Sequence, residues 1–291
     1  MNAATIKGLT TKLNKQLAQL APGELLVKEN LHADVYHGCE GVSTSKLKLF
    51  MECPAKYKAR YITGEVEQKE SKAFDVGKGA HGLILEPHKW DSEFILQPSD
   101  IKVRRGKAWD AFKEKAGNKV VLTADDWEAC HGMRDAVAAH HFGSRLLSRG
   151  RAEVSYFKRD EETGLIIKCR PDYEMDDLLV DVKTAMSSNP AEFARKAKSL
   201  MYHVQDAIYR DITGKDAFAF LAVEKEKPYV VTAPLHFDDD AVRLGHLKYR
   251  KALNDLALSI QFNHFEGYTS GPAVMSLKPW ERHELEQLEA A

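Results

Sequence analysis

The chain has 291 residues, of which 44% are hydrophobic and 29% are charged, and this composition is typical of a globular protein that can bury a core. Its 42 basic and 43 acidic residues give a net charge of −1, which excludes a globally basic chain, so any contact with DNA must come from local patches. The sequence contains no apolar run long enough to cross a bilayer, and its four cysteines include no CxxC pair. We therefore expect a cytoplasmic protein with reduced thiols and no membrane contact.

The N-terminal part of the chain contains two candidate helical segments. Residues 1–40 begin with a Lys- and Leu-containing segment that fits an amphipathic helix, with an interaction arm or a disordered start as alternatives, and we assign them to an N-terminal arm or helix. A further helix is predicted from Ser43, with Pro54 beginning a second helical turn. This stretch is the most basic helical segment of the chain and makes Arg60 a candidate DNA contact, although a solvated cationic face explains it equally well.

His81 lies in a glycine-rich stretch, with Gly77 and Gly79 before it and Gly82 directly after it. These glycines allow a helix to pack tightly or the backbone to approach closely around the histidine. A lone histidine is more often structural than a ligand.

Residues 98–123 interleave basic side chains with Trp109 and Phe112. This pattern is typical of a loop or arch that touches a phosphate backbone, and a solvated loop is the alternative interpretation. The candidate DNA contacts in this insertion are Arg104, Arg105 and Lys107. A helix is then predicted over residues 123–147, with Thr123 as its N-cap.

The β-prone stretch at residues 151–158 places Glu153, Ser155 and Phe157 on one face of a strand. We expect this strand to pair with the hairpin described next. It could thereby bring Glu153 towards a metal ion as an outer ligand.

A β-hairpin is predicted at the centre of the chain, from an Ile- and Tyr-rich run at residues 164–175 and a second run at residues 178–182. If Asp176 and Asp177 form the loop, the register places Asp172 opposite Asp181. Two opposed carboxylates destabilise a sheet unless a cation lies between them. Hard oxygen ligands of this kind favour Mg²⁺ or Mn²⁺ over zinc.

Lys183 is expected on the same face as Asp181, because side chains two positions apart on a strand point the same way. An ammonium group beside a metal carboxylate can position or deprotonate an attacking water and offset developing negative charge. The trio of Asp172, Asp181 and Lys183 therefore predicts metal-assisted phosphodiester hydrolysis. A surface hairpin with solvated acidic residues is the alternative.

The segment after the hairpin predicts a helix capped by Asn189, with an apolar stripe from Phe193 to Ile208. Gln205 and Tyr209 lie four residues apart on an adjacent face, available to the site. Two β-prone runs and a helix over about residues 238–260 follow. We assign residues 41–265 to a single domain and residues 266–291 to a peripheral tail.

Five ordered motifs carry a resemblance to a known family. They are S-x-L-x-x-F-x-x-C-P-x-x-Y at residues 45–57, G-x-G-x-H-x-x-x-L-E-P at 77–87, R-P-D at 170–172, D-V-K at 181–183 and Q-x-x-x-Y at 205–209. Together they resemble the PD-(D/E)XK nuclease superfamily, and within it the RecE-type exonuclease (exonuclease VIII) of phages and prophages. The resemblance covers about residues 43–225.

The resemblance implies an α/β (α+β mixed) fold with a restriction-endonuclease-like core, in which a mixed central β-sheet is flanked by helices. It implies that Asp172 and Asp181 bind Mg²⁺ together with the backbone carbonyl of Val182. Lys183 would be the catalytic lysine, and His81 an additional residue of the metal site.

Gln205 and Tyr209 match the helix of this family that supports the site or contacts DNA, and Glu153 has only a loose match. Some nucleases with a similar core carry an iron–sulfur cluster, usually with cysteines grouped near the C-terminus. No cysteine follows Cys169 here, so no such cluster is expected.

The activity implied is Mg²⁺-dependent 5′-to-3′ digestion of one strand of linear double-stranded DNA from its ends. Relatives of this type form homo-oligomeric rings and act beside a single-strand annealing protein of the RecT or Bet kind. Two alternatives remain. One is an endonuclease or structure-specific nuclease of the same fold, and the other is a catalytically silent DNA-binding module.

Overall fold

The computed structural model describes residues 1–66 and 72–290, and within them the largest sheet has five strands in the order β10-β9-β8-β7-β4. β8 and β9 are parallel, and the other neighbours are antiparallel, so the sheet is mixed. Its strands are β4 (Arg151–Ala152), β7 (Tyr173–Glu174), β8 (Leu178–Ala185), β9 (Ala217–Glu224) and β10 (Val231–Leu235). The predicted mixed central sheet flanked by helices is confirmed.

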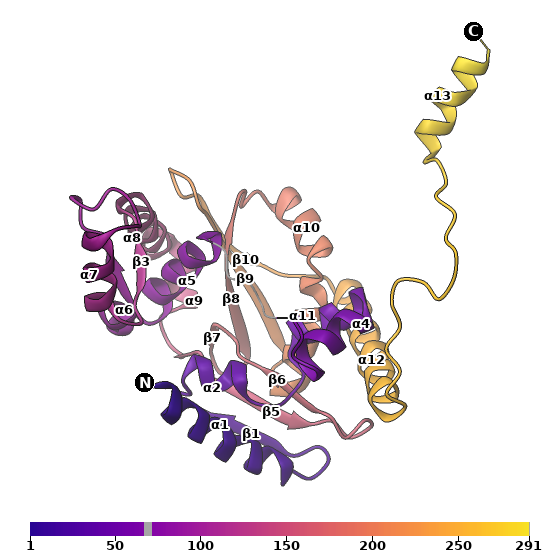
Figure 1. Ribbon diagram of the computed structural model, residues 1–291, viewed down its shortest axis with the longest axis horizontal. Coiled ribbons are helices and arrows are strands. Elements are labelled where there is room, and N and C mark those ends of the chain that lie inside the picture. Colours follow the sequence, from indigo (N-terminus) through magenta and orange to yellow (C-terminus); the bar gives the residue numbers. More distant parts are fainter. Residues whose placement is uncertain (67–71, 291) are drawn as a thin grey trace.

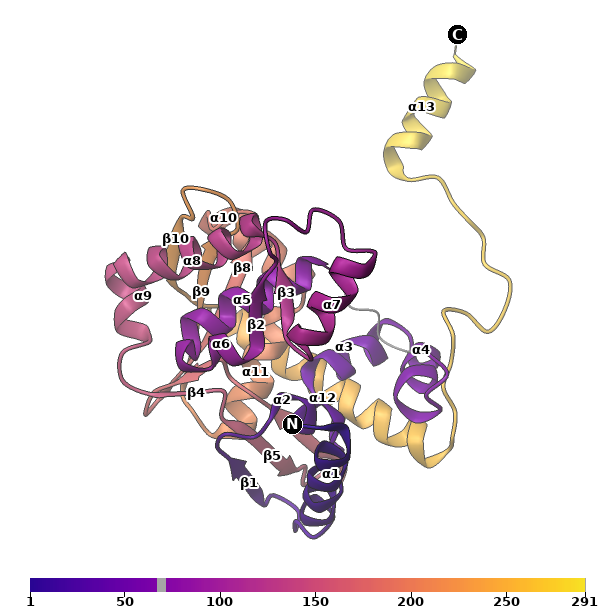
Figure 2. The same cartoon turned by 60° about the vertical axis from the view of Figure 1, so that its left-hand side comes forward.

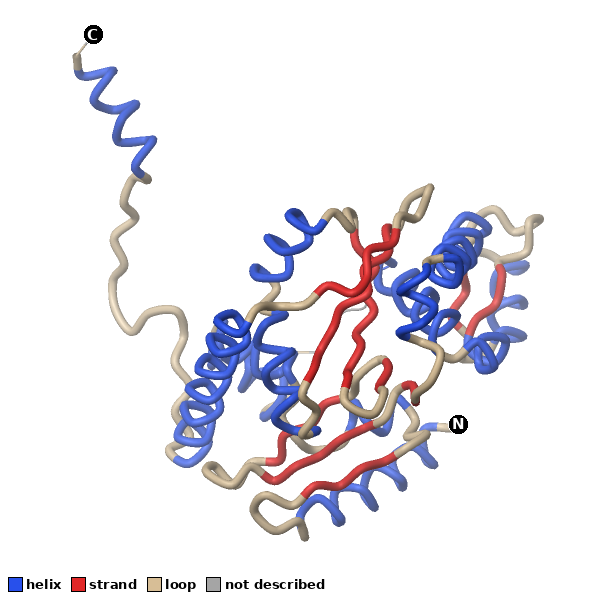
Figure 3. Tube along the Cα trace, turned by 180° about the vertical axis from the view of Figure 1, so that it is seen from behind, coloured by secondary structure: helices blue, strands red, loops and turns tan. Residues whose placement is uncertain are grey.

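Helices cover both faces of the central sheet (Figures 1 and 3). One face packs against α5 (Lys72–Leu85), α8 (Ala124–Ala139) and α9 (His141–Leu146), and the other against α10 (Pro190–Ser199) and α11 (Tyr202–Thr213). In β8, Val180 and Val182 belong to the first core and Leu179 to the second. Because side chains alternate along a strand, Asp181 and Lys183 share the face of α10 and α11.

A second sheet joins β1 (Leu25–Lys28), β5 (Ser155–Arg159) and β6 (Ile166–Cys169) in the order β1-β5-β6. α1 (Ala3–Ala18) and α2 (Ala33–Gly38) pack on it through a small apolar core that includes Leu17, Tyr36 and Phe157. The first 40 residues are thus tied to the rest of the chain by a strand pairing and by buried side chains.

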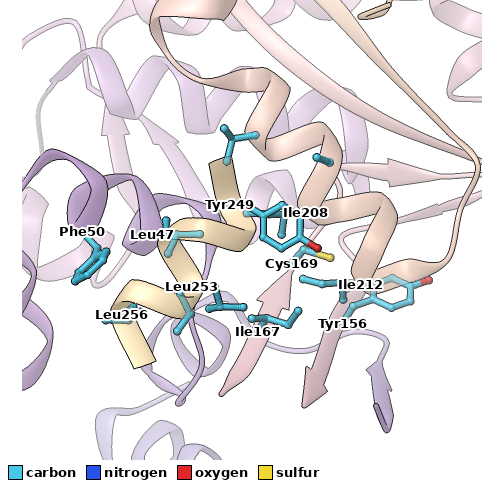
Figure 4. Packing of buried hydrophobic residues seen from close by; sticks show 14 of the residues in the cluster. Leu47, Phe50, Tyr156, Ile167, Cys169, Ile208, Ile212, Tyr249, Leu253 and Leu256 are labelled. Atoms are coloured by element: carbon cyan, nitrogen blue, oxygen red, sulfur yellow. The ribbon is translucent and has the colours of Figure 1, made fainter. Parts of the chain in front are cut away.

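The largest buried cluster joins α3 (Thr44–Glu52), α11, α12 (Asp239–Gln261), β5 and β6 (Figure 4). Ser43 caps α3, and Pro54 begins α4 (Pro54–Tyr57), both as predicted. A π-helix, Lys58–Ile62, follows α4. Gly245 of α12 lies so close to α11 that a Cβ atom there would be 2.1 Å from the His203 carbonyl oxygen, so only glycine fits without rearrangement.

The chain between α5 and α8 forms a small lobe. It contains a 3₁₀ turn (Pro87–Lys89), α6 (Trp90–Glu93), β2 (Phe94–Leu96), α7 (Lys107–Ala116) and β3 (Val120–Leu122), with β2 and β3 parallel. The segment at 98–123 is therefore not a continuous loop, because α7 and β3 lie inside it. Gly79 allows α5 to pack closely on α8, since a Cβ atom there would be 2.8 Å from Cys130 Sγ.

Four predicted elements are divided in the structure, each at a local change of backbone direction. The strand expected over 151–158 breaks at Glu153, whose φ is +56°, so β4 and β5 enter different sheets. The strand expected over 164–175 breaks around Pro171, which cannot donate a ladder hydrogen bond. The helix expected over 190–208 breaks at Met201 (φ +53°), and the helix over 123–147 breaks at His140.

The C-terminal segment leaves the rest of the molecule. Phe265 stacks on Tyr57 with 6.5 Å between ring centroids, and the Glu266 carbonyl accepts a hydrogen bond from Ala55 N (2.9 Å). Tyr268 donates a further hydrogen bond to Glu52 Oε1 at 3.2 Å. Beyond these contacts the chain extends outwards to α13 (Pro279–Glu289), which Figures 1 and 2 show apart from the other helices. None of the described helices is long and apolar enough to span a membrane.

Candidate active site

The central hairpin places the predicted pair of aspartates opposite each other. Tyr173 pairs with Val180 and Glu174 with Leu179, and Met175 N donates to the Leu178 carbonyl at 2.8 Å. This is the predicted register, with Asp176 and Asp177 in the loop. Continued by one residue past Tyr173, it sets Asp172 opposite Asp181.

Asp172 is held at the point where β7 and β8 separate. Its Oδ2 accepts a hydrogen bond from the backbone N–H of Val182 at 2.7 Å, and its side chain is only 15% exposed. Burial, and then the charge of Asp181, raise the pKa of Asp172 well above its ordinary value, although Lys183 opposes this. The site therefore holds a carboxylate that is destabilised in its charged form unless a cation is near.

The backbone of Val182 points towards Asp172. The N–H and C=O groups of one strand residue lie on the same side, and the Val182 N–H is already bound to Asp172. The carbonyl oxygen therefore faces the same region. Sequence resemblance had implied this carbonyl as a ligand, and the backbone direction is compatible with that role.

Asp181 and Lys183 form an ion pair at the face covered by α11. The Lys183 ammonium contacts Asp181 Oδ2, while Oδ1 accepts a hydrogen bond from Gln205 Nε2 at 2.5 Å. Burial disfavours the charge on Lys183, but the carboxylates of Asp181 and Asp172 outweigh it and raise the pKa of Lys183. The two carboxylates therefore hold Lys183 in its cationic form.

His81 reaches the site from α5 on the other face of the sheet. Its Nδ1 lies 3.4 Å from Asp172 Oδ2. Burial, and then the charge of Lys183, lower the pKa of His81 to about 4. The imidazole is therefore neutral near pH 7, which is the form that ligates metals.

Glu153 lies beside Arg170, at the break between β4 and β5. Arg170 Nε is 3.5 Å from Glu153 Oε2 and donates to Ser155 Oγ at 2.9 Å, and its guanidinium lies over the Tyr36 ring. Burial raises the pKa of Glu153 to about 7, with Arg170 opposing and Glu86 adding to the shift. The main chain of Glu153 also donates to the Asp172 carbonyl at 3.1 Å. A main-chain hydrogen bond thus links Glu153 to Asp172.

Tyr209 lies one turn after Gln205 on α11. Its hydroxyl is 3.5 Å from the Arg170 carbonyl, at the long limit for a hydrogen bond, and its ring packs on Phe218. Tyr209 thus supports the segment that leads into Asp172 and is not shown to contact Asp181.

The four predicted DNA contacts do not gather at the aspartates. Arg104 donates to Gln97 Oε1 and to the Val121 carbonyl, each at 2.9 Å, so its guanidinium fixes the lobe around β3. Arg105 and Lys107 are exposed near the start of α7. Arg60 lies in the π-helix, with a buried Nε that has no hydrogen-bond partner.

Two side chains beside the site were not predicted. Tyr202, the first residue of α11, has the Lys183 ammonium 4.8 Å from its ring centroid and the Lys48 ammonium 5.3 Å from it. Burial, and then the charge of Lys183, lower the pKa of Lys48 to about 8. The sequence marked Lys48 only as one cation of a basic helix, because its proximity to Lys183 depends on how α3 and α11 pack.

The donor groups around Asp172 and Asp181 fit a hard divalent cation. Asp181 Oδ2 is buried and makes no hydrogen bond, although it is paired with Lys183, and carboxylate and carbonyl oxygens suit Mg²⁺ or Mn²⁺. Within residues 1–66 and 72–290, no group of three or more His, Cys, Asp or Glu side chains is arranged to hold a metal. The ligand set would therefore combine the two carboxylates with the Val182 carbonyl, with His81 beside them.

The fold and the site define a protein of the PD-(D/E)XK class, with paired acidic residues on a hairpin followed by a lysine. Residues 43–271 match the family described as a PDDEXK-like domain of unknown function (DUF3799), and the chain belongs to that family. No curated protein matches the chain.

A solved structure shares this fold. It is the crystal structure of a protein from Eubacterium rectale described as a "putative exonuclease", with a TM-score of 0.58 and 16% sequence identity. The match covers 89% of this chain and 98% of that one. At this identity the likeness concerns the fold.

Proposed function

We propose that the protein is a Mg²⁺-dependent deoxyribonuclease that digests one strand of linear double-stranded DNA from its 5′ end and leaves 3′ single-stranded overhangs. The observation that carries this proposal is the hairpin register, which opposes Asp172 to Asp181 with Lys183 paired to the latter. A buried pair of like charges is retained at a cost in stability, and such pairs mark functional sites. The family match supports the nuclease class.

Some residues of the site would bind the cation, and Lys183 would stabilise negative charge. Asp172, Asp181 and the Val182 carbonyl would hold the cation, which when bound supplies Lewis acidity towards a phosphate oxygen and lowers the pKa of water. Lys183 carries a positive charge that attracts the phosphodiester and offsets the negative charge that develops during hydrolysis. Since its pKa is raised, Lys183 acts as a cation and hydrogen-bond donor.

The neighbouring groups fix the two carboxylates. Gln205 donates to Asp181 Oδ1, which leaves Oδ2 directed at Lys183, and the Val182 N–H holds Asp172 Oδ2. Such hydrogen bonds keep ligating oxygens in place without contributing ligands of their own. Neutral His81 adds an uncharged donor beside Asp172.

The 5′-to-3′ polarity, the preference for ends and the role in recombination come from the resemblance to RecE-type exonucleases. We propose on the same basis that the protein forms a homo-oligomeric ring and works with a single-strand annealing protein. The Eubacterium rectale protein is itself described as a "putative exonuclease", which supports this proposal. An endonuclease of the same fold and a silent DNA-binding module are the competing functions.

End dependence and polarity are tested with linear duplexes labelled at one 5′ end or at one 3′ end and a covalently closed circle, each incubated with Mg²⁺ or with EDTA, and binding of the duplex is measured by gel shift. The proposal predicts early release of the 5′ label with Mg²⁺ and an intact circle. Early release of a 3′ label instead would refute the polarity. Cleavage of the circle would identify an endonuclease, and binding without any cleavage would identify the silent module.

A further inference from the structure

Four lysines from four different elements surround the start of α11, beside the active site. They are Lys48 of α3, Lys183 of β8, Lys198 of α10 and Lys248 of α12. Lys198 lies next to the helix start, because its carbonyl oxygen accepts a hydrogen bond from Met201 N at 3.0 Å. Lys183 is paired with Asp181, whereas Lys198 and Lys248 are exposed to solvent. Because no two of these lysines belong to the same element, their convergence is a property of the tertiary fold.

Tyr202 links two of these cations. Its ring stacks on Phe220, with 5.5 Å between centroids and 22° between planes. The Lys183 and Lys48 ammonium groups approach the same ring at 4.8 and 5.3 Å. An aromatic ring attracts cations through its negative face, so Tyr202 holds the two like charges near one another despite their repulsion.

His203 extends the cluster outwards from Tyr202. Its side chain is buried, 4% exposed, and its Nδ1 has no hydrogen-bond partner, while its Nε2 lies 3.5 Å from Lys248 Nζ. Burial, and then the charges of Lys248, Lys48 and Lys198, lower the pKa of His203. The charges that act most strongly on this buried ring are thus all positive.

The backbone at this point also favours an anion. α11 has 12 residues and begins after Met201, which adopts a left-handed conformation and offers no side-chain cap. The first N–H groups of a helix and its macrodipole attract negative charge. Gly245 brings α12, and with it Lys248, against this helix start. An uncapped helix start, an unpartnered buried histidine and converging lysines occur together.

We propose that this cluster binds backbone phosphates of a nucleic-acid strand next to the phosphodiester that is hydrolysed, with Lys48 nearest the reacting centre and Lys198 and Lys248 farther out. The inference rests on the proposed function. A strand of phosphodiesters fits better than a single small anion, because the cations are spread over several elements and continue directly from Lys183 through Tyr202. The contact is to phosphates and carries no sequence preference.

The test is equilibrium binding of a fluorescent single-stranded oligonucleotide and of a duplex with a 3′ overhang, measured by anisotropy in Ca²⁺ over a range of salt concentrations. The variants are Lys198→Gln, Lys248→Gln and the double variant, each exposed in the fold and checked by circular dichroism. Lys251→Gln is the matched control, since Lys251 lies three residues from Lys248 on α12 and pairs with Asp255 at 2.6 Å.

Each single variant is expected to weaken binding roughly threefold to tenfold at low salt and to reduce the slope of log K against log salt by about 0.7 for single strands. The double variant should show about twice that change, and Lys251→Gln should bind like the wild type. Equal slopes in the wild type and the double variant would overturn the inference.

The same protein samples separate this inference from the proposed function. If the wild type binds the oligonucleotide but hydrolyses nothing when Mg²⁺ replaces Ca²⁺, the proposed function fails and the salt slopes still decide the inference. A wild-type protein that binds neither oligonucleotide would overturn both.

Discussion

The opposed aspartates predict that neutralising one of them stabilises the protein while it removes activity. The substitution Asp172→Asn keeps the size of the side chain, and its amide oxygen can still accept the hydrogen bond from Val182 N. The substitution removes the negative charge that lies beside Asp181. We therefore expect a protein that melts at a higher temperature than the wild type in EDTA and does not hydrolyse DNA.

The magnitude follows from Coulomb's law. Opposed residues on one face of a sheet have Cβ atoms about 5 Å apart, and two charges at that distance repel by about 3 kcal/mol at an effective dielectric constant of 20. Lys183, paired with Asp181, offsets part of this repulsion. A net gain of about 1–3 kcal/mol is expected, which corresponds to roughly 2–5 °C in melting temperature for a chain of this size.

The gain should depend on pH in a defined direction. The pKa of Asp172 is raised in the folded state, so the folded protein binds the proton more tightly than the unfolded chain. The penalty is absent below the unfolded pKa of about 3.9 and grows as the pH rises through the folded value. The difference in melting temperature between Asp172→Asn and the wild type should therefore widen as the pH rises.

The assay is thermal unfolding followed by circular dichroism in EDTA at several pH values, then with increasing Mg²⁺. Mg²⁺ should raise the melting temperature of the wild type more than that of Asp172→Asn, because binding to the folded state stabilises it. Asp177→Asn, in the exposed hairpin loop, is the control and should change neither quantity. A variant that is less stable than the wild type at every pH would refute the reasoning.

Three further predictions concern packing and support of the site. Gly245→Ala should lower the free energy of unfolding by more than about 3 kcal/mol in urea titrations, because its Cβ would lie 2.1 Å from the His203 carbonyl oxygen; wild-type stability would contradict this. Gln205→Leu should raise the Mg²⁺ concentration needed for half-maximal hydrolysis by about 10- to 100-fold, because Asp181 loses its orienting hydrogen bond; an unchanged Mg²⁺ titration would count against it. Removal of residues 272–291 should leave the melting temperature unchanged, because α13 lies apart from the other helices, and a lower value would show a missed contact.

The parts of the site that were predictable come from local patterns. The alternation of a strand and a two-residue loop fix which residues face each other, and this was sufficient for Asp172, Asp181 and Lys183. The helical spacing placed Gln205 on a face adjacent to the apolar stripe, available to the site, and the structure brings it to Asp181.

The parts that were missed depend on long-range packing or on unusual backbone conformations. Met201 and Glu153 adopt positive φ without being glycine or asparagine, so the sequence contained no signal for the breaks at these positions. Lys48 meets Tyr202 only because α3 packs near the start of α11. The hydrogen bonds of Arg104 to Gln97 and to the Val121 carbonyl also depend on how the lobe folds, and its role as a DNA contact stays a prediction.

The most direct test of the account is Mg²⁺-dependent hydrolysis of a linear duplex by the wild type, Asp181→Ala and Lys183→Ala, with thermal unfolding to show that each variant is folded. The account predicts acid-soluble nucleotide release by the wild type with Mg²⁺, none in EDTA, and a loss of at least about 100-fold in both folded variants. Release by folded Asp181→Ala or Lys183→Ala at the wild-type rate would contradict it, because these two side chains form the ion pair on which the proposed chemistry depends.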